Sequence, residues 1–158
     1  MCTKRSPRMP HSSIQLNAHL IFSTKTCEPV LNLQIRAGVH ECLTALAHEA
    51  GSPLAVAGGT ADHVHMLIEM PNLLAPVDVV EHVKKESEAF VRKLGPEFEA
   101  FSWQRGYGMF SVGPMQKAGV ERYVQSQEEH HKKRSFQDEF RGLLEWYDIE
   151  YDEQTMWD

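Results

Sequence analysis

The chain has 158 residues, of which 42% are hydrophobic and 24% are charged, and 16 Lys and Arg against 22 Asp and Glu give a formal net charge of −6. These values are typical of one ordinary soluble domain. The acidic total argues against a protein that wraps duplex DNA through bulk charge. No apolar run approaches the roughly 20 residues of a membrane helix, no apolar signal region is present, and three scattered cysteines form no disulfide framework. The sequence therefore predicts a cytoplasmic protein without a membrane partner.

Hydrophobic periodicity predicts four strands and four helices. Strands are expected where apolar and polar residues alternate, and helices where apolar residues recur every three or four positions. Gly51 is placed to cap the first helix, Pro76 to open the second, and Gly95 with Pro96 to end it. In chain order the predicted elements are a half-buried strand at 14–22, a helix at 35–50, strands at 54–57 and 63–70, a helix at 76–94, a strand at 109–112, and helices at 114–130 and from 135.

The order of these elements predicts the fold class. Residues 1–13 are basic, contain two prolines and lack apolar periodicity, so we expect a disordered tail before a single domain over 14–158. The order β-α-β-β-α-β is the split β-α-β plan, a ferredoxin-like α/β (α+β) fold with helices on one face of an antiparallel sheet, here followed by C-terminal helices. Because this plan hosts many unrelated functions, it predicts no activity by itself.

Two histidines in the predicted strand at 63–70 are candidate metal ligands. His63 and His65 are separated by one residue, so both side chains project from the same face of the strand, with about 7 Å between their α-carbons. Val64 and Met66 face the opposite way, into the core. Two imidazoles can converge on one metal but do not complete a site. The alternative is a pair of solvent-facing histidines on a polar face.

The helix predicted at 114–130 could supply the missing groups. Tyr123 and Gln127 are four residues apart, which makes them neighbours across one helical turn. This spacing would place a nucleophilic phenol beside an amide ligand for the metal. The alternative is a core tyrosine whose hydroxyl lies at the edge of the core.

The densest positive segment runs from His130 to Arg134. It could contact backbone phosphates through a local field, or it could be a solvated turn whose charges complement a helix carboxyl end. The polar face of the helix at 76–94 is also basic. The candidate DNA-contact residues are Lys84, Lys85, Lys132, Lys133 and Arg134.

Several segments together resemble the single-tyrosine HUH transposases of the insertion-sequence 200/605 type, that is, IS200-like transposases. The matching segments are LNAHLIFSTK, GGTADHVHMLIEMP with its HUH triplet (His, hydrophobic, His), SWQRGYGMFSV, RYVQSQEEHHKKRSFQDEF and IEYDEQTMWD. The resemblance covers most of residues 14–158. It implies that His63 and His65 bind a divalent metal, that Tyr123 attacks DNA, and that Gln127 completes the metal site.

The resemblance also implies a reaction, which is cleavage and rejoining of single-stranded DNA at insertion-sequence ends. Attack by Tyr123 would leave a 5′-phosphotyrosine and a free 3′-hydroxyl, and the reverse attack would rejoin strands without a nucleotide cofactor. A protonated phenol is a poor nucleophile, so a metal that polarises the phosphate is needed. Two imidazoles favour zinc, nickel or manganese and magnesium prefers oxygen ligands, whereas the family is associated with Mg²⁺ or Mn²⁺, which we therefore expect here.

The implied partners are DNA hairpins at the ends of the element, in a bacterial or archaeal genome, and a second copy of the chain. In the family the protein is a homodimer, and the tyrosine helix of one subunit can complete the HUH site of the other. Two other functions fit the sequence. One is a domesticated protein that binds DNA hairpins without moving any DNA, and the other is a hydrolytic metalloenzyme that uses water in place of Tyr123.

Overall fold

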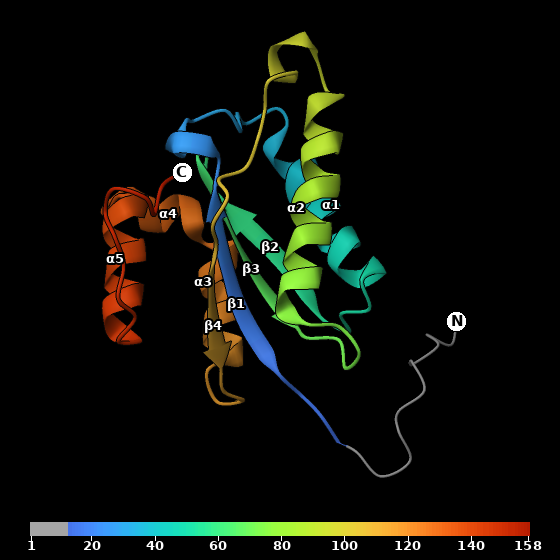
Figure 1. Ribbon diagram of the computed structural model, residues 1–158, viewed down its shortest axis with the longest axis vertical. Helices are drawn as coiled ribbons and strands as arrows, with labels where there is room; N and C mark the ends of the chain where they lie inside the picture. Colours follow the sequence, from blue (N-terminus) through green and yellow to red (C-terminus); the bar gives the residue numbers. More distant parts are fainter. Residues whose placement is uncertain (1–12) are drawn as a thin grey trace.

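A four-stranded antiparallel sheet forms the centre of the molecule (Figure 1). The computed structural model describes residues 13–158, so the predicted tail at 1–13 lies, apart from its last residue, outside the described residues. The sheet order is β2-β3-β1-β4, which confirms the predicted split β-α-β plan. The strands are β1 (Asn17–Ser23), β2 (Ala55–Gly59), β3 (His63–Glu69) and β4 (Gly108–Val112).

Two helices cover one face of the sheet, α1 (Arg36–Glu49) and α2 (Pro76–Arg92). Their apolar sides pack on the larger hydrophobic core, which includes Val64 and Met66 of β3, both fully buried as predicted. Gly51, just after α1, has a φ of +95°, the left-handed conformation expected of a helix-capping glycine. Two short 3-10 helices, η1 (Lys25–Cys27) and η2 (Pro96–Phe98), lie in the connections.

The last three helices cover the opposite face of the sheet (Figure 1): α3 (Lys117–Gln125), α4 (Gln127–His131) and α5 (Phe136–Trp146). This face has apolar contacts of its own, between the sheet and α5 and between the sheet and α3. All residues of β1 are buried as a result, so the prediction of a half-buried first strand is wrong. Of the alternating polar residues that suggested a solvated face, His19 is buried with its ring against that of Tyr123 in α3.

The helix predicted at 114–130 is divided into α3 and α4. Ser126 separates them, with φ and ψ of −105° and 21°, which are not helical values. The predicted neighbours nevertheless remain in contact, because the side-chain amide of Gln127 donates a hydrogen bond to the backbone oxygen of Tyr123 over 3.0 Å. The break changes the direction of the chain while keeping these two residues together.

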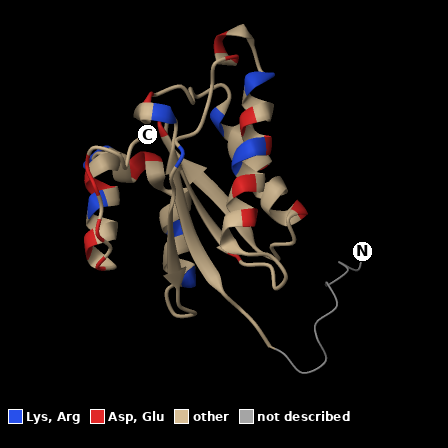
Figure 2. Cartoon of the chain, viewed as in Figure 1, with Lys and Arg blue, Asp and Glu red and all other residues tan. Residues whose placement is uncertain are grey.

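Residues of opposite charge are mixed along the helices. Lys and Arg alternate with Asp and Glu along α2 and α5 (Figure 2), and Glu88 pairs with Arg92 and Asp138 with Arg141 within single helices. Such pairs at spacings of three and four residues support the helices locally. Across residues 13–158, no helix has both the length and the apolar character needed to span a membrane.

Glycine is required at one point where α3 crosses the sheet. An ideal Cβ at Gly58 of β2 would lie 1.9 Å from the backbone oxygen of Val124 in α3. Atoms do not approach this closely, so any side chain at this position would push the helix away from the sheet. Val124 is fully buried and follows Tyr123 directly. The close contact therefore sets the height of Tyr123 above the sheet.

We predict that Gly58→Ala lowers the free energy of unfolding by about 1 to 3 kcal/mol, because the added methyl group overpacks the contact with α3. Urea denaturation would measure the change. Gly38→Ala in α1 is the matched control, since a Cβ there meets no atom within 4 Å. It should stabilise the helix by about 0.5 to 1 kcal/mol. Equal stability of the Gly58 and Gly38 variants would contradict the packing argument.

Candidate active site

Side chains from three elements meet on the face of the sheet that α3, α4 and α5 cover. His63 and His65 of β3, His131 of α4 and Glu139 of α5 each offer one ligand atom, and all these atoms lie within 4.8 Å of one another. We call these four residues the histidine-glutamate cluster. His63 and His65 are both 0% exposed, so the alternative of a solvent-facing pair is wrong.

Hydrogen bonds orient both histidines of β3. Nδ1 of His63 donates to the carboxylate of Asp62 over 2.6 Å, and Nδ1 of His65 lies 2.8 Å from Nε2 of His19. Such partners fix the ring orientation and the tautomer of metal-binding histidines. Both Nε2 atoms are then directed into the cluster, where that of His65 lies 3.3 Å from Glu139. Burial alone would raise the pKa of the Asp62 carboxyl, but its hydrogen bond and charge interaction with His63 hold that pKa below its ordinary value.

Gln127 turns its amide oxygen toward the same space. Its nitrogen donates to the backbone of Tyr123, and Oε1 lies 3.0 Å from Nε2 of His131 and 3.4 Å from Nε2 of His63. The amide is buried. The side chain therefore adds one oxygen to the three nitrogens and the carboxylate of the cluster.

The donor set fits a divalent cation. Nε2 of His65 and Nε2 of His131 lie 3.3 Å and 2.9 Å from one carboxylate oxygen of Glu139. Nevertheless Nε2 of His65 and both carboxylate oxygens are buried and form no hydrogen bond of normal geometry, which is unusual for buried polar atoms. Burial raises the pKa of Glu139 to about 8, and burial together with the neighbouring histidines lowers the pKa of His65 well below its ordinary value. Unpaired lone pairs that converge in this way match the needs of a metal ion, and imidazole nitrogen with carboxylate oxygen suits manganese, iron or zinc.

Tyr123 lies at the edge of the cluster within the same chain. Its ring centroid is 5.7 Å from that of His65 and 5.9 Å from that of His19, in edge-on contacts. The side chain is half-buried, and its hydroxyl lies 3.4 Å from Nε2 of His130. The structure thus brings together His63, His65, Tyr123 and Gln127, the four residues that the sequence singled out.

Comparison with known proteins identifies the family and the fold. The family model described as "Transposase IS200 like" matches residues 12–127 of the chain. This chain belongs to the IS200-like transposase family. No curated protein sequence matches it significantly.

Two solved structures share the fold of this IS200-like protein. A candidate transposase from Deinococcus radiodurans R1 is 24% identical with a TM-score of 0.58, over 77% of this chain and 98% of the other. A REP-associated tyrosine transposase bound to a REP hairpin is 9% identical with a TM-score of 0.52, over 75% of this chain and 70% of the other. At these identities the likeness establishes the fold and no further property.

Two members of the cluster in this IS200-like transposase, His131 and Glu139, are not among the metal ligands that the sequence predicts. In the sequence His131 belongs to the basic segment, although it is four residues from Gln127, the same helical spacing that links Tyr123 to Gln127. Glu139 carries no local signal, because only the docking of α5 brings it to the sheet. Both residues lie beyond the segment that the family model matches, 12–127.

The candidate DNA-contact residues do not converge. Lys84 and Lys85 lie in α2, on the face of the sheet away from the cluster, whereas the other three follow or end α4. The ammonium group of Lys84 donates to three backbone oxygens, at positions 104, 105 and 106, and burial lowers its pKa to about 8. Lys132 pairs with Glu129, and Arg134 donates to the backbone of Asp138.

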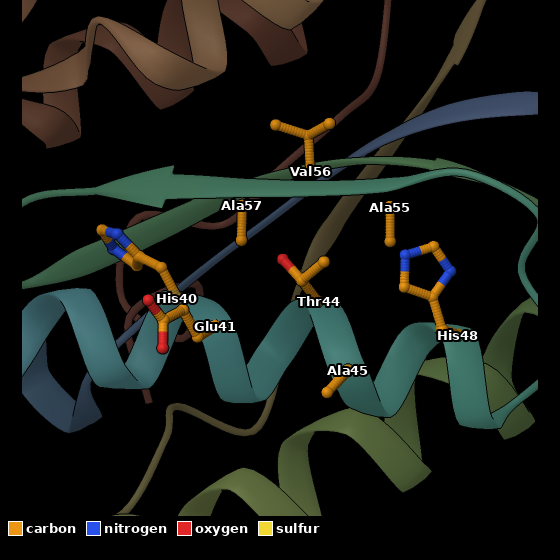
Figure 3. A pocket seen from close by; sticks show the side chains of 8 residues that line it. All are labelled: His40, Glu41, Thr44, Ala45, His48, Ala55, Val56 and Ala57. Atoms are coloured by element: carbon orange, nitrogen blue, oxygen red, sulfur yellow. The ribbon is translucent and has the colours of Figure 1, made fainter.

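Two hollows flank the sheet, one on each face. A hollow of about 440 Å³ lies between α1 and β2, with His40 and His48 at its two ends and Val56 turned away from α1 (Figure 3). A second hollow, of about 450 Å³, lies between α3 and α5 and reaches Tyr123. Of these two hollows, the second borders the candidate site and the first does not.

We predict that the metal-free protein loses stability as the pH falls below 6.5. Burial lowers the pKa of His19 and of His40 to about 4, so each takes up a proton on unfolding between these pH values. The pKa values of three more imidazoles, those of His65, His130 and His131, are also lowered. The raised pKa of Glu139 has the opposite effect on stability, but it is one group against five imidazoles. Urea titrations with a chelator should show the decline, and His40→Gln should make it shallower. A free energy of unfolding that stays constant from about pH 7 to 5 would contradict the lowered pKa values of these buried histidines.

Proposed function

We propose that this protein is an active transposase that cleaves and rejoins single-stranded DNA, with Tyr123 as the nucleophile. The observation that carries this proposal is the contact, within one chain, between the ring of Tyr123 and a buried cluster of metal-binding character. Membership of the IS200-like transposase family supports the same reaction.

We propose that His63, His65, His131 and Glu139 hold a divalent metal and that Oε1 of Gln127 adds an oxygen ligand. When bound, the ion acts as a Lewis acid toward the scissile phosphate. Of the two ions expected from the resemblance, Mg²⁺ and Mn²⁺, the donor set favours Mn²⁺, since three imidazoles suit manganese better than magnesium.

The residues of the chain then perform the transfer. The hydroxyl oxygen of Tyr123 attacks phosphorus, and the bond from phosphorus to the 3′ oxygen breaks, which leaves a 5′-phosphotyrosine and a free 3′-hydroxyl. His130 accepts the phenolic proton, because its Nε2 lies 3.4 Å from the hydroxyl and burial, with Arg134 and His63 nearby, lowers its pKa and keeps it neutral. The leaving oxygen takes a proton from solvent. Attack by a 3′-hydroxyl on the phosphotyrosine reverses these steps.

The resemblance also suggests a DNA partner and an assembly for this protein. Hairpin binding is a property of the REP-associated relative, and we propose that this protein also binds hairpin ends, through unpaired bases and local contacts. Lys85 and Lys133 are exposed and available for phosphate contacts. The position of Tyr123 beside His65 of its own chain favours use of both residues within one subunit, whether or not a homodimer forms.

One observation favours a second function, that of a domesticated hairpin-binding protein. Metal sites closed by four protein ligands are commonly structural, whereas catalytic sites keep an open position. His131 and Glu139 would bring the number of histidine and carboxylate ligands to four. A four-coordinate ion would then stabilise the fold without contacting DNA, whereas a six-coordinate Mn²⁺ would keep a position for the phosphate.

We predict that Tyr123→Phe abolishes a covalent adduct between the protein and single-stranded DNA carrying the ends of the element, in the presence of Mn²⁺. Denaturing gel electrophoresis of labelled DNA would detect the adduct. Tyr107→Phe is the matched control, since Tyr107 is also partly exposed and lies outside the cluster, and it should form the adduct normally. Adduct formation by the Tyr123 variant would reassign the nucleophile. Cleavage without an adduct would support hydrolysis by water, and hairpin binding without cleavage would support the domesticated protein.

We predict that Glu139→Gln weakens Mn²⁺ binding at least about tenfold, because it removes the one carboxylate of the cluster. Isothermal titration of the chelator-treated protein would measure the affinity. Glu145→Gln makes the same chemical change on the exposed side of the same helix and should bind Mn²⁺ as the unchanged protein does. If the two variants bind equally well, Glu139 is not a ligand.

A further inference from the structure

The hollow between α3 and α5 is an open groove that ends at the proposed nucleophile. His19 of β1 forms part of its floor, Gln116, Gly119 and Tyr123 form part of the α3 wall, and Trp146 and Tyr147 form part of the α5 wall. We call it the α3-α5 groove. Its volume is about 450 Å³. The α5 wall lies beyond the segment that the family model matches, so the family match does not account for the groove.

We infer that the α3-α5 groove binds one unpaired nucleobase of the DNA strand that carries the scissile phosphate. This inference rests on the proposed function, because it takes Tyr123 as the residue that meets the phosphate. Tyr123 is both the proposed nucleophile and a wall of the groove. A base joined to that phosphate therefore has the groove beside it.

The aromatic side chains of the α5 wall suit a nucleobase. Trp146 is 83% exposed, which leaves a large flat surface in water at the rim of the groove. Tyr147 is held in place, since its hydroxyl donates to the backbone oxygen of Ser111 over 2.9 Å and its ring lies 4.8 Å from that of Phe110. Stacking on aromatic side chains is the usual way in which proteins bind unpaired bases, and a wall fixed in advance loses little entropy on binding.

The α3 wall offers space and one polar group. A Cβ at Gly119 would meet no atom within 4 Å, so the helix leaves open room at this point. Oε1 of Gln116 accepts a hydrogen bond from the backbone of Gly113 over 3.1 Å, which leaves its amino group to donate to the edge of a base. A flat heterocycle with acceptor atoms at its edge matches both features.

The groove is also linked to the metal cluster through its floor. Nε2 of His19 lies 2.8 Å from Nδ1 of His65, so the floor of the groove is the hydrogen-bond partner of a proposed ligand. Binding of a base in the groove and of a phosphate at the cluster would therefore occur on adjacent sides of Tyr123. This arrangement would position the strand for attack as well as hold it.

The test uses the full chain and two fluorescein-labelled single strands, an oligothymidine of about 12 nucleotides and an abasic strand with the same number of phosphates. Fluorescence anisotropy would measure both affinities. The unchanged protein should prefer the oligothymidine. Gly119→Leu, which fills the groove, should weaken oligothymidine binding about 5- to 100-fold and leave binding of the abasic strand unchanged. Trp146→Ala should have the same effect without filling the groove, and because Trp146 is exposed this variant should fold normally.

Gly38→Leu is the matched control, since Gly38 also has no atom within 4 Å of its Cβ and lies in α1 on the other face of the sheet. It should bind both strands as the unchanged protein does. Equal binding of the two strands by the unchanged protein would overturn the inference, as would normal oligothymidine binding by both groove variants. A changed oligomeric state of these variants with unchanged affinity would also overturn it, in favour of contact between copies of the chain.

The outcome is separable from that of the proposed function. If Tyr123 forms an adduct and the groove variants bind oligothymidine normally, only the groove inference fails. If the groove variants lose the preference for oligothymidine and no adduct forms, the proposed cleavage fails and the groove remains a base-binding site.

Discussion

Burial of both faces of the sheet is the constraint on which the candidate site depends. One face is covered by apolar contacts with α1 and α2, but the other face of β1 and β3 carries His19, His63 and His65, all buried. Imidazoles removed from water require partners for their ring nitrogens. Hydrogen bonds at Nδ1 supply one partner for His63 and one for His65. Nε2 of His65 then faces Glu139, and Nε2 of His63 faces the amide oxygen of Gln127. Burial thus turns the polar side of two strands into a set of ligands.

Two local features hold the helices over this set. The absence of a side chain at Gly58 lets α3 approach the sheet closely, which brings Tyr123 to the edge of the cluster. The break at Ser126 then redirects the chain, so that Gln127 and His131 turn inward from α4. Gln127 and His131 are one helical turn apart within α4, so both point into the same space, where Oε1 of Gln127 lies 3.0 Å from Nε2 of His131. The nucleophile and the ligands therefore depend on backbone geometry that is not itself catalytic.

Much of the fold follows from local patterns, and the exceptions share one cause. Alternation and helical spacing predicted all four strands and the order of the helices, and the two-residue repeat of a strand correctly placed His63 and His65 on one face. The same reasoning made the first strand half-buried and the helix at 114–130 continuous, both of which are wrong. Periodicity reports which side of an element is polar, but a polar side is exposed only if nothing packs on it. Here the C-terminal helices pack on it.

The identity of the elements, the pairing of His63 with His65 and the proximity of Tyr123 to Gln127 were accessible from residue spacing, because each involves neighbours within one strand or one helical turn. The recruitment of Glu139, the partnership of His19 with His65 and the groove beside Tyr123 were not accessible in this way. Each joins residues far apart in the chain whose distance depends on how α5 or β1 lies against the rest of the molecule. Spacing along a chain constrains short distances only, and packing sets the long ones.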